Sequence, residues 1–180
     1  REKKVVMAVI FVCGVHGAGK TTFCQKLAKG LNVPHFSASA LIKEKSAQAI
    51  SDEAGDKRVK NIDDNQTLLI AAVREKAALH AKIILDGHTT IIDKSGCYQR
   101  LPETVFRDLG ITAMVLLEVP APEIVRRLSL RDGPAPNANF IAAHQTAEKE
   151  HARHLADAIK VQLYNLDGSK EGLLDIWGKL

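Results

Sequence analysis

A glycine-rich stretch lies between an apolar run and a helical pattern near the start of the chain. Val5–Cys13 are almost continuously apolar, which is typical of a strand covered on both faces. The residues that follow, GVHGAGKT at 14–21, fit the pattern G-x-x-x-x-G-K-[ST]. Apolar residues at helical spacing then predict a helix over 21–31, and Gly30 lies where we expect that helix to end. The order strand, glycine loop, helix predicts an α/β domain in which the loop follows a central strand.

Phosphate binding accounts for the three glycines of this loop. Successive backbone N–H groups have to turn inward around phosphate oxygens, which requires backbone angles and a close approach that side chains obstruct. The following helix adds the partial positive charge of its N-terminus. We expect Lys20 to reach the β- and γ-phosphates and the Thr21 hydroxyl to bind Mg²⁺. The expected cofactors are therefore ATP and Mg²⁺, and the residues expected to bind them are Gly14, His16, Gly17, Ala18, Gly19, Lys20, Thr21 and Thr22, with no side-chain role assigned to His16.

Strand-like and helix-like patterns alternate along the rest of the chain. We predict further strands over 33–37, 82–87, 111–119 and 160–168, and helices over 38–50, 64–80, 103–109, 122–131, 140–159 and 171–180. The stretches 51–64 and 88–102 lack periodicity and are predicted to be irregular. This alternation predicts a parallel sheet with helices on both faces. Such a sheet binds its ligands at the carboxyl ends of its strands.

Asp86 stands at one of these strand ends, in the sequence KIILDG. A carboxylate in that position can hold a Mg²⁺-bound water or a substrate group, so we predict that it binds metal together with Thr21. Gly87 lets the chain pass close to a ligand. His88 and Thr89 follow and are predicted to line the pocket of a phosphate-accepting substrate, the alternative being a solvated loop.

Basic residues gather in two places. Arg127 and Arg131 share a helix face before the break DGPAPNAN, and arginines on a closing segment commonly neutralise the charge of a phosphoryl-transfer transition state. Arg126 points elsewhere and is expected to be solvated. In the irregular stretch 51–64, Arg58 suits a bidentate contact with an acceptor's phosphate, the alternative being plain surface charge.

Three histidines, His144, His151 and His154, project from one side of the predicted helix over 140–159. A metal cluster is one interpretation, but we favour histidines on the surface.

Composition limits the remaining classes of function. A chain of 180 residues with 46% hydrophobic content suits one domain, and no apolar run is long enough to span a bilayer. Three cysteines without metal-type spacing predict reduced thiols in a cytoplasmic protein. An aromatic content of 4% argues against a base-stacking platform for nucleic acid, and a net charge of +4 is a weak signal for phosphate-bearing ligands. The oligomeric state stays open, a homo-oligomer included.

These features together resemble the P-loop nucleoside monophosphate kinases, and most closely adenylate kinases of the archaeal type. The resemblance rests on GVHGAGKTT, SASALIKE, RVKNIDDNQTLLI, LDGHTT with the later KSGCY and LP, EIVRRL before a short break, and HQ in the penultimate helix. It implies a single domain over 1–180 with the three-layer P-loop NTPase fold. The sheet would have five parallel strands in the order 2-3-1-4-5, with an acceptor-binding excursion over 35–65 and a short lid over 131–139.

The resemblance also implies transfer of the γ-phosphoryl group of ATP to a nucleoside monophosphate. Catalysis would involve Lys20, Asp86, Arg127 and Arg131, and the acceptor would contact Ser39, Lys43, Arg58, Gly87, His88 and Thr89. Many of these kinases carry arginine where this chain has Lys43, and another arginine just after the Asp-Gly, where this chain has His88-Thr89-Thr90. A lysine is a point charge rather than a planar fork, so these departures bear on the choice of acceptor more than on phosphoryl transfer. The lid lacks cysteines, which excludes a zinc-bearing lid.

Two other functions fit the sequence. The first is a kinase for a hydroxyl-bearing metabolite, in which Asp86 would act as the base. The second is a nucleotide-dependent switch or assembly module that hydrolyses ATP slowly.

Overall fold

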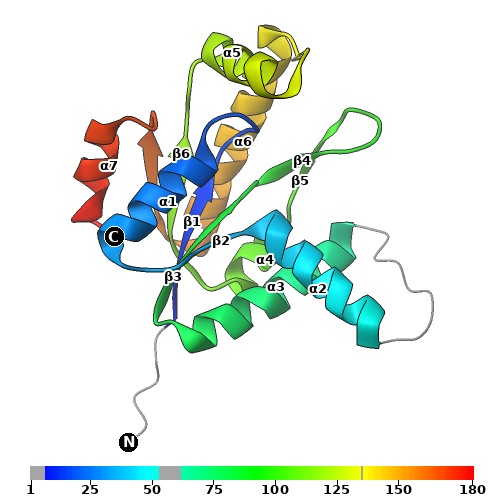
Figure 1. Ribbon diagram of the computed structural model, residues 1–180, viewed down its shortest axis with the longest axis vertical. Coiled ribbons are helices and arrows are strands. Elements are labelled where there is room, and N and C mark those ends of the chain that lie inside the picture. Colours follow the sequence, from blue (N-terminus) through cyan, green and yellow to red (C-terminus); the bar gives the residue numbers. More distant parts are fainter. Residues whose placement is uncertain (1–6, 53–61, 135) are drawn as a thin grey trace, which may run out of the picture.

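Five parallel strands form the centre of the computed structural model, which describes residues 7–52, 62–134 and 136–180 (Figure 1). They are β1 (Ala8–Cys13), β2 (His35–Ser37), β3 (Lys82–Gly87), β6 (Ile111–Leu117) and β7 (Gln162–Leu166). The strands lie in the order β2-β3-β1-β6-β7. Numbered by their own sequence order, the five strands follow 2-3-1-4-5, which confirms the predicted topology.

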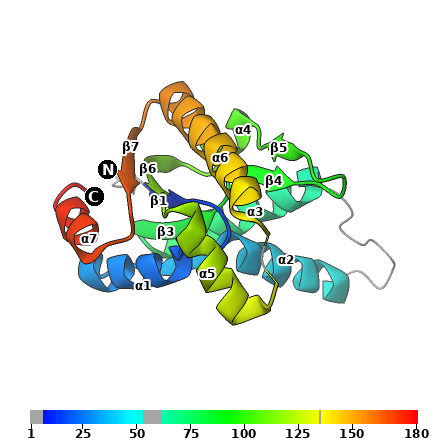
Figure 2. The ribbon, with the colours of Figure 1, turned by 90° about the horizontal axis from the view of Figure 1, so that it is seen from above.

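Helices cover both faces of this sheet and complete three layers (Figure 2). On one face lie α1 (Lys20–Leu31), α5 (Ala121–Asp132) and α7 (Lys170–Trp177). On the other face lie α3 (Ile62–Leu79), α4 (Glu103–Asp108) and α6 (Ala138–Ile159), and α2 (Ala38–Asp52) packs on α3. Among the described helices, none is both long and apolar enough to cross a membrane.

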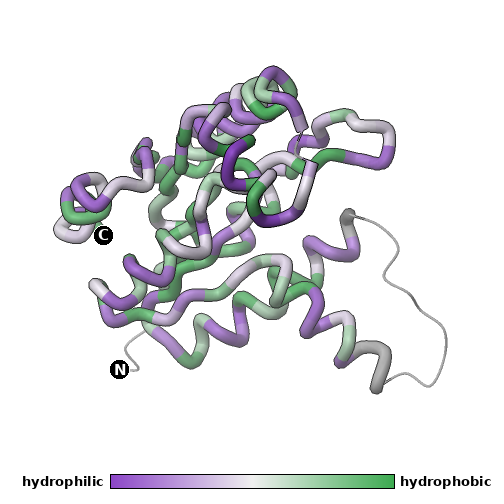
Figure 3. The backbone as a smooth tube through the Cα atoms, turned by 45° about the horizontal axis from the view of Figure 1, so that its top comes forward, coloured by the Kyte–Doolittle hydropathy of each residue, from purple (hydrophilic) through white to green (hydrophobic). Residues whose placement is uncertain are grey.

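The apolar run of β1 supplies both cores. Val9, Phe11 and Cys13 pack toward α3, α4 and α6, whereas Ile10 and Val12 pack toward α1, α5 and α7. Since side chains alternate across a strand, a strand covered on both sides has to be apolar at every position. The central strands are accordingly mostly hydrophobic, whereas polar and apolar stretches alternate along the helices (Figure 3).

Three local predictions were wrong. The stretch 88–102 contains an antiparallel hairpin, β4 (Thr90–Ile92) and β5 (Tyr98–Arg100), whose turn is held because Asp93 accepts hydrogen bonds from Ser95 and Cys97 N–H. The third helix begins at Ile62, earlier than predicted. The end of α1 at Leu31 is confirmed, but Gly30 lies inside the helix and the left-handed Asn32 caps it.

Gly30 instead provides room for another helix. A Cβ on Gly30 would lie 2.4 Å from the indole of Trp177, so only glycine lets α7 pack this closely against α1. The sequence pattern could not show this, because a helix-ending glycine and a helix-packing glycine look alike until the partner helix is known.

Candidate functional site

The glycine loop between β1 and α1 has the backbone of a phosphate-binding nest. Gly14, Gly17 and Gly19 have φ angles of 151°, 85° and 89°, which side-chain-bearing residues rarely adopt. A Cβ on Gly14 would lie 2.9 Å from the Leu117 carbonyl oxygen. The α1 N-terminus has no side-chain cap, so its N–H groups are available to an anion.

Lys20 is the first residue of α1 and folds back over this loop. Its Nζ donates hydrogen bonds to the carbonyl oxygens of Gly14, at 2.7 Å, and Val15, at 3.1 Å. Burial lowers the pKa of Lys20, while the Glu148 and Asp86 carboxylates oppose that shift. The ammonium is thus held at the loop by main-chain oxygens, in reach of any anion that the loop binds.

Two arginines of α5 approach the same loop. Arg127 donates to the Ala18 carbonyl oxygen at 3.4 Å and to Glu123 at 2.8 Å. Arg131 lies 2.6 Å from His16 Nε2 and is paired with the neighbouring Asp132. Both predicted arginines therefore lie beside the glycine loop, whereas Arg126 is exposed and bound to Glu123.

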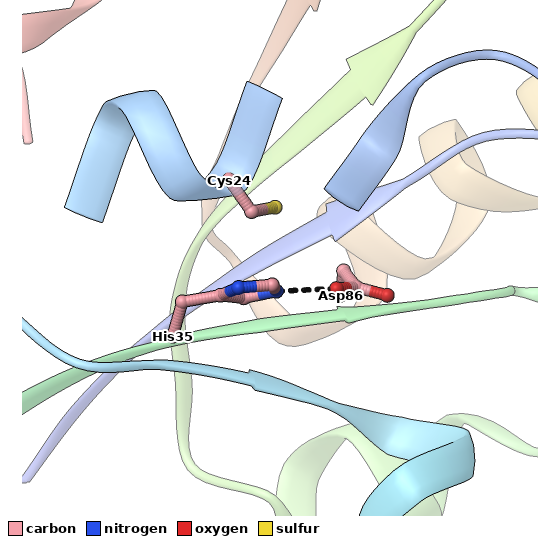
Figure 4. Close-up of side chains that lie close together, drawn as sticks. All are labelled: Cys24, His35 and Asp86. Atoms are coloured by element: carbon pink, nitrogen blue, oxygen red, sulfur yellow. Dashed lines mark hydrogen bonds and ion pairs between the residues drawn. The ribbon is translucent and has the colours of Figure 1, made fainter. Parts of the chain in front are cut away.

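Asp86 is buried at the end of β3, and its partner is a residue that the sequence did not suggest. His35 of β2 forms a hydrogen bond with its Oδ2 through Nε2 (Figure 4). Both side chains are largely buried, being 13% and 8% exposed. The two residues are 51 positions apart. Only the pairing of β2 with β3 brings them together, so no local pattern could have revealed His35.

A cavity of about 340 Å³ lies over the glycine loop. It is lined by polar residues from the loop, β2–α2, β3 and α5. Most of the predicted cofactor-binding and catalytic residues meet there: His16, Gly17, Gly19, Lys20, Thr21, Thr22, Asp86, Arg127 and Arg131.

A second cavity, of about 220 Å³, adjoins the first and has mainly apolar walls. Ser37, Ser39, Asp86 and His88 line both cavities, so the two meet at Asp86. His88 Nδ1 and Gln66 Oε1 are buried in its wall without a hydrogen-bond partner. Burial, followed by the charge of Lys20, lowers the pKa of His88 to about 4. Besides the Asp86 carboxylate, the cavity wall thus presents neutral polar groups, and no lysine or arginine among the described residues lines it.

Two predicted acceptor contacts lie elsewhere, and one falls outside the described residues. Thr89 is fully buried, and its N–H donates to Glu148 of α6, so it lines neither cavity. Lys43 is exposed on α2 and lines neither cavity. Arg58 lies outside the described residues. Gly87 lines the second cavity, where a Cβ would lie 3.1 Å from the ring of Phe11.

The histidines of α6 do not form a surface group. His144 and His151 are buried, 9% and 5% exposed, whereas His154 is exposed. His151 Nε2 donates to the Leu101 carbonyl oxygen, and the His144 ring stacks on Tyr98. The prediction of surface histidines was therefore wrong for two of the three, because this face of α6 packs against the hairpin.

A third cavity, of about 830 Å³, lies between α1, α7 and the loop before α7. Its apolar wall includes Phe23, Leu173 and Trp177. Arg127 and Gly19 line it as well, so it extends from the glycine loop.

Comparison with known proteins agrees with this architecture. The chain is 24% identical over 173 residues to an adenylate kinase of Corynebacterium urealyticum, a match that covers 91% of this chain and 93% of that protein. It is 26% identical over 173 residues to a cytidylate kinase of Pyrobaculum arsenaticum, covering 94% of this chain and 82% of that one.

Solved structures share the fold at lower identity. A shikimate kinase from Bacteroides thetaiotaomicron matches with a TM-score of 0.55 and 18% identity, over 96% of this chain and 95% of the other. A gluconokinase from Sinorhizobium meliloti 1021 matches with a TM-score of 0.54 and 17% identity, over 97% of this chain and 95% of the other. A family profile described as an AAA domain matches residues 13–139, which contain the glycine loop, Asp86 and both arginines. The chain therefore belongs to this AAA domain family, AAA_17, and has the fold of the small P-loop kinases.

Proposed function

We propose that this protein is an ATP- and Mg²⁺-dependent phosphotransferase. The observation that carries the proposal is the glycine nest with Lys20, which opens on a cavity that also contains Asp86, Arg127 and Arg131. The residues fit a triphosphate, because the N-terminus of α1 has no side-chain cap and Lys20 supplies a cation beside it. Thr21 and Asp86 line the same cavity and offer the oxygen ligands that Mg²⁺ prefers. When bound, Mg²⁺ would neutralise charge on the phosphates.

The residues of the chain then have separate tasks. Lys20 exchanges its two carbonyl partners for phosphate oxygens. Arg127 and Arg131 stabilise the charge that spreads over the transferred group. The segment 131–139 acts as a lid that excludes water. The 830 Å³ cavity beside Gly19 and Arg127 accommodates the nucleoside, with apolar walls for its base.

A nucleoside monophosphate is the leading acceptor. Relatives named adenylate kinase and cytidylate kinase support it, as does the second cavity, which meets the first at Asp86. The acceptor oxygen would already be anionic, so the reaction would need positioning and charge neutralisation rather than a base. Ser39, which lines both cavities, is proposed to bind the monophosphate, and Arg58, outside the described residues, is proposed to help, whereas Lys43 lines neither cavity and is given no role.

A hydroxyl-bearing metabolite is the second candidate, and one observation favours it. The second cavity has no described lysine or arginine in its wall, yet it has a buried carboxylate partnered by His35 and neutral polar atoms without partners. Asp86 would take the proton of the acceptor hydroxyl as that oxygen bonds to the γ-phosphorus and the bond from this phosphorus to the departing ADP breaks.

The experiment is ATP turnover by the full chain with a panel of nucleoside monophosphates and small alcohols, each compared with ATP alone. Stimulation by a monophosphate supports the leading acceptor, and stimulation by an alcohol alone supports the second. Slow hydrolysis that no acceptor stimulates, together with a change in oligomeric state, would contradict a phosphotransferase and support a switch.

Lys20→Ala tests the role of the loop directly. We expect turnover to fall by about 10²-fold or more, because a preorganised cation at the transferred phosphate is lost. The control is Lys179→Ala, which removes an exposed ion pair with Asp175 and should leave turnover unchanged. Equal activity of both variants would show that the loop does not perform the chemistry.

A further inference from the structure

Three side chains able to bind a metal ion meet beside the glycine loop. They are Cys24 of α1, His35 of β2 and Asp86 of β3, and their ligand atoms all lie within 4.8 Å of one another. The Cys24 Sγ points from α1 toward the place where the His35 ring meets the Asp86 carboxylate (Figure 4). Within the part of the chain that the structure describes, no second group of three such residues occurs.

The ligand types select the class of metal. Mg²⁺ takes oxygen ligands and keeps its waters, so a sulfur and an imidazole nitrogen do not suit it. One thiolate, one imidazole and one carboxylate are ligands of Zn²⁺ and of related transition metals. We propose that Cys24, His35 and Asp86 form a site for a transition-metal dication such as Zn²⁺, which shares Asp86 with the proposed Mg²⁺ position.

The balance of charge supports this assignment. On binding, a sulfur–metal bond forms and the thiol proton leaves to solvent, with no change of oxidation state. The thiolate and the carboxylate together neutralise a dication, and a neutral imidazole adds no charge. A site without net charge avoids the large cost of burying an unpaired ion. This matters because Cys24 is fully buried and Asp86 is 6% exposed.

The site has an approach from the cavities. Asp86 lines both the cavity over the glycine loop and the second cavity, so the carboxylate connects the buried cysteine to open space. Three protein ligands leave one position of a tetrahedral metal for a water or a substrate oxygen. Because His35 bonds to Asp86, the metal would replace that hydrogen bond with two metal–ligand bonds.

Occupation of this site has a consequence that rests on the proposed function. A carboxylate that binds a transition metal together with Cys24 and His35 is withdrawn from Mg²⁺ or from the acceptor. Zn²⁺ is therefore expected to inhibit phosphoryl transfer, and Cys24→Ser is expected to relieve the inhibition.

Cobalt titration of the chelator-treated full chain tests the site without reference to activity. We expect one equivalent of Co²⁺ to produce a sulfur-to-cobalt charge-transfer band in the near ultraviolet. Zn²⁺ should abolish the band and Mg²⁺ should not. Cys24→Ser should lose the band, and His35→Gln should weaken Co²⁺ binding by about 10-fold or more. The matched control is Cys97→Ser, because Cys97 is an exposed thiol of the hairpin region and its loss should change nothing.

Two results would overturn the proposal: absence of the band in the unchanged protein, and a band that survives Cys24→Ser but not Cys97→Ser. Circular dichroism verifies that each variant is folded, and Cys24→Ala replaces the serine variant if a buried hydroxyl prevents folding. The activity assay separates the two proposals. A cobalt band without inhibition by Zn²⁺ would contradict the role of Asp86 in catalysis, whereas absence of the band would contradict the metal site alone.

Discussion

Gly14 shows how the loop depends on a single residue. Its φ of 151° and the closeness of the Leu117 carbonyl oxygen, 2.9 Å from an added Cβ, leave room for hydrogen alone. At Gly96 in the hairpin turn φ is 83°, but an added Cβ would meet nothing within 4 Å. Substitution of Gly96 therefore tests the cost of the backbone conformation alone, whereas substitution of Gly14 adds the cost of a steric collision.

We expect Gly14→Ala to lower the free energy of unfolding by about 1–3 kcal/mol or more, because strain and collision add. Gly96→Ala, the control, should cost about 1–2 kcal/mol, since it meets the conformational penalty alone. Urea denaturation measures both. Equal losses would show that the contact with Leu117 yields easily and that the loop tolerates a side chain.

At the scale of one element, the buried polar side chains of helix α6 find hydrogen-bond partners in neighbouring segments. Glu148 is 1% exposed and accepts hydrogen bonds from the N–H groups of Thr89 and Thr90 at 2.8 and 2.9 Å. The Thr90 hydroxyl also donates to its carboxylate. His144 and His151 lie on the same face, each about one helical turn from Glu148. The helix thereby holds the chain that follows Asp86, which positions His88 in the second cavity.

Glu148→Gln should lower the free energy of unfolding by about 1.5–3 kcal/mol. The amide keeps the shape but has one acceptor oxygen, so it turns an NH₂ group toward donors that the carboxylate accepted. Glu150→Gln on the same helix is the control, because Glu150 is exposed and its loss should cost within about 0.5 kcal/mol. Chemical denaturation measures the stability of both variants. Similar losses of stability would mean that the hydrogen bonds of Glu148 to Thr89 and Thr90 do not stabilise the fold.

His151 should make stability depend on pH. Burial lowers the pKa of His151, although the hydrogen bond to Leu101 opposes the shift. The folded state thus favours the neutral ring, so the unfolded chain binds more protons once the pH falls below about 6.5. Stability should therefore fall as the pH drops through that value. Between about pH 7.5 and 5.5 the unchanged protein should lose more stability than His151→Gln, which denaturation at each pH measures; equal losses in the two proteins would contradict this.

At the scale of the whole molecule, the three cavities described above lie next to one another around the glycine loop and Asp86. Strand order places β1 between β3 and β6, so the glycine loop after β1 lies between Asp86 and the α5 arginines. The large cavity extends from the same loop on the α1 side. A nucleotide bound there would contact several elements at once and so stabilise the fold as a unit.

Binding of ATP and Mg²⁺ should raise the free energy of unfolding by about 2.7 kcal/mol at a concentration 100 times the dissociation constant. For a chain of this size each kcal/mol raises the melting temperature by roughly 2–4 °C. Thermal denaturation should show this shift, and removal of Mg²⁺ by a chelator should reduce it. Lys20→Ala should show a smaller shift at the same concentration. A shift identical in the Lys20 variant would mean that the nucleotide binds outside the glycine loop.

The sequence by itself determined the elements that local patterns encode. The strand, the glycine nest and Lys20 are contiguous, and the alternation of strands and helices follows from periodicity, so both were predicted. Contacts between distant segments depended on which strands pair and which helix faces meet. His35 reaches Asp86 across 51 residues, Glu148 holds Thr90 across 58, and Gly30 admits Trp177 from another helix. Only the tertiary structure decided these three contacts, because residues that are far apart in the sequence come together only when the strands pair and the helices pack on the sheet.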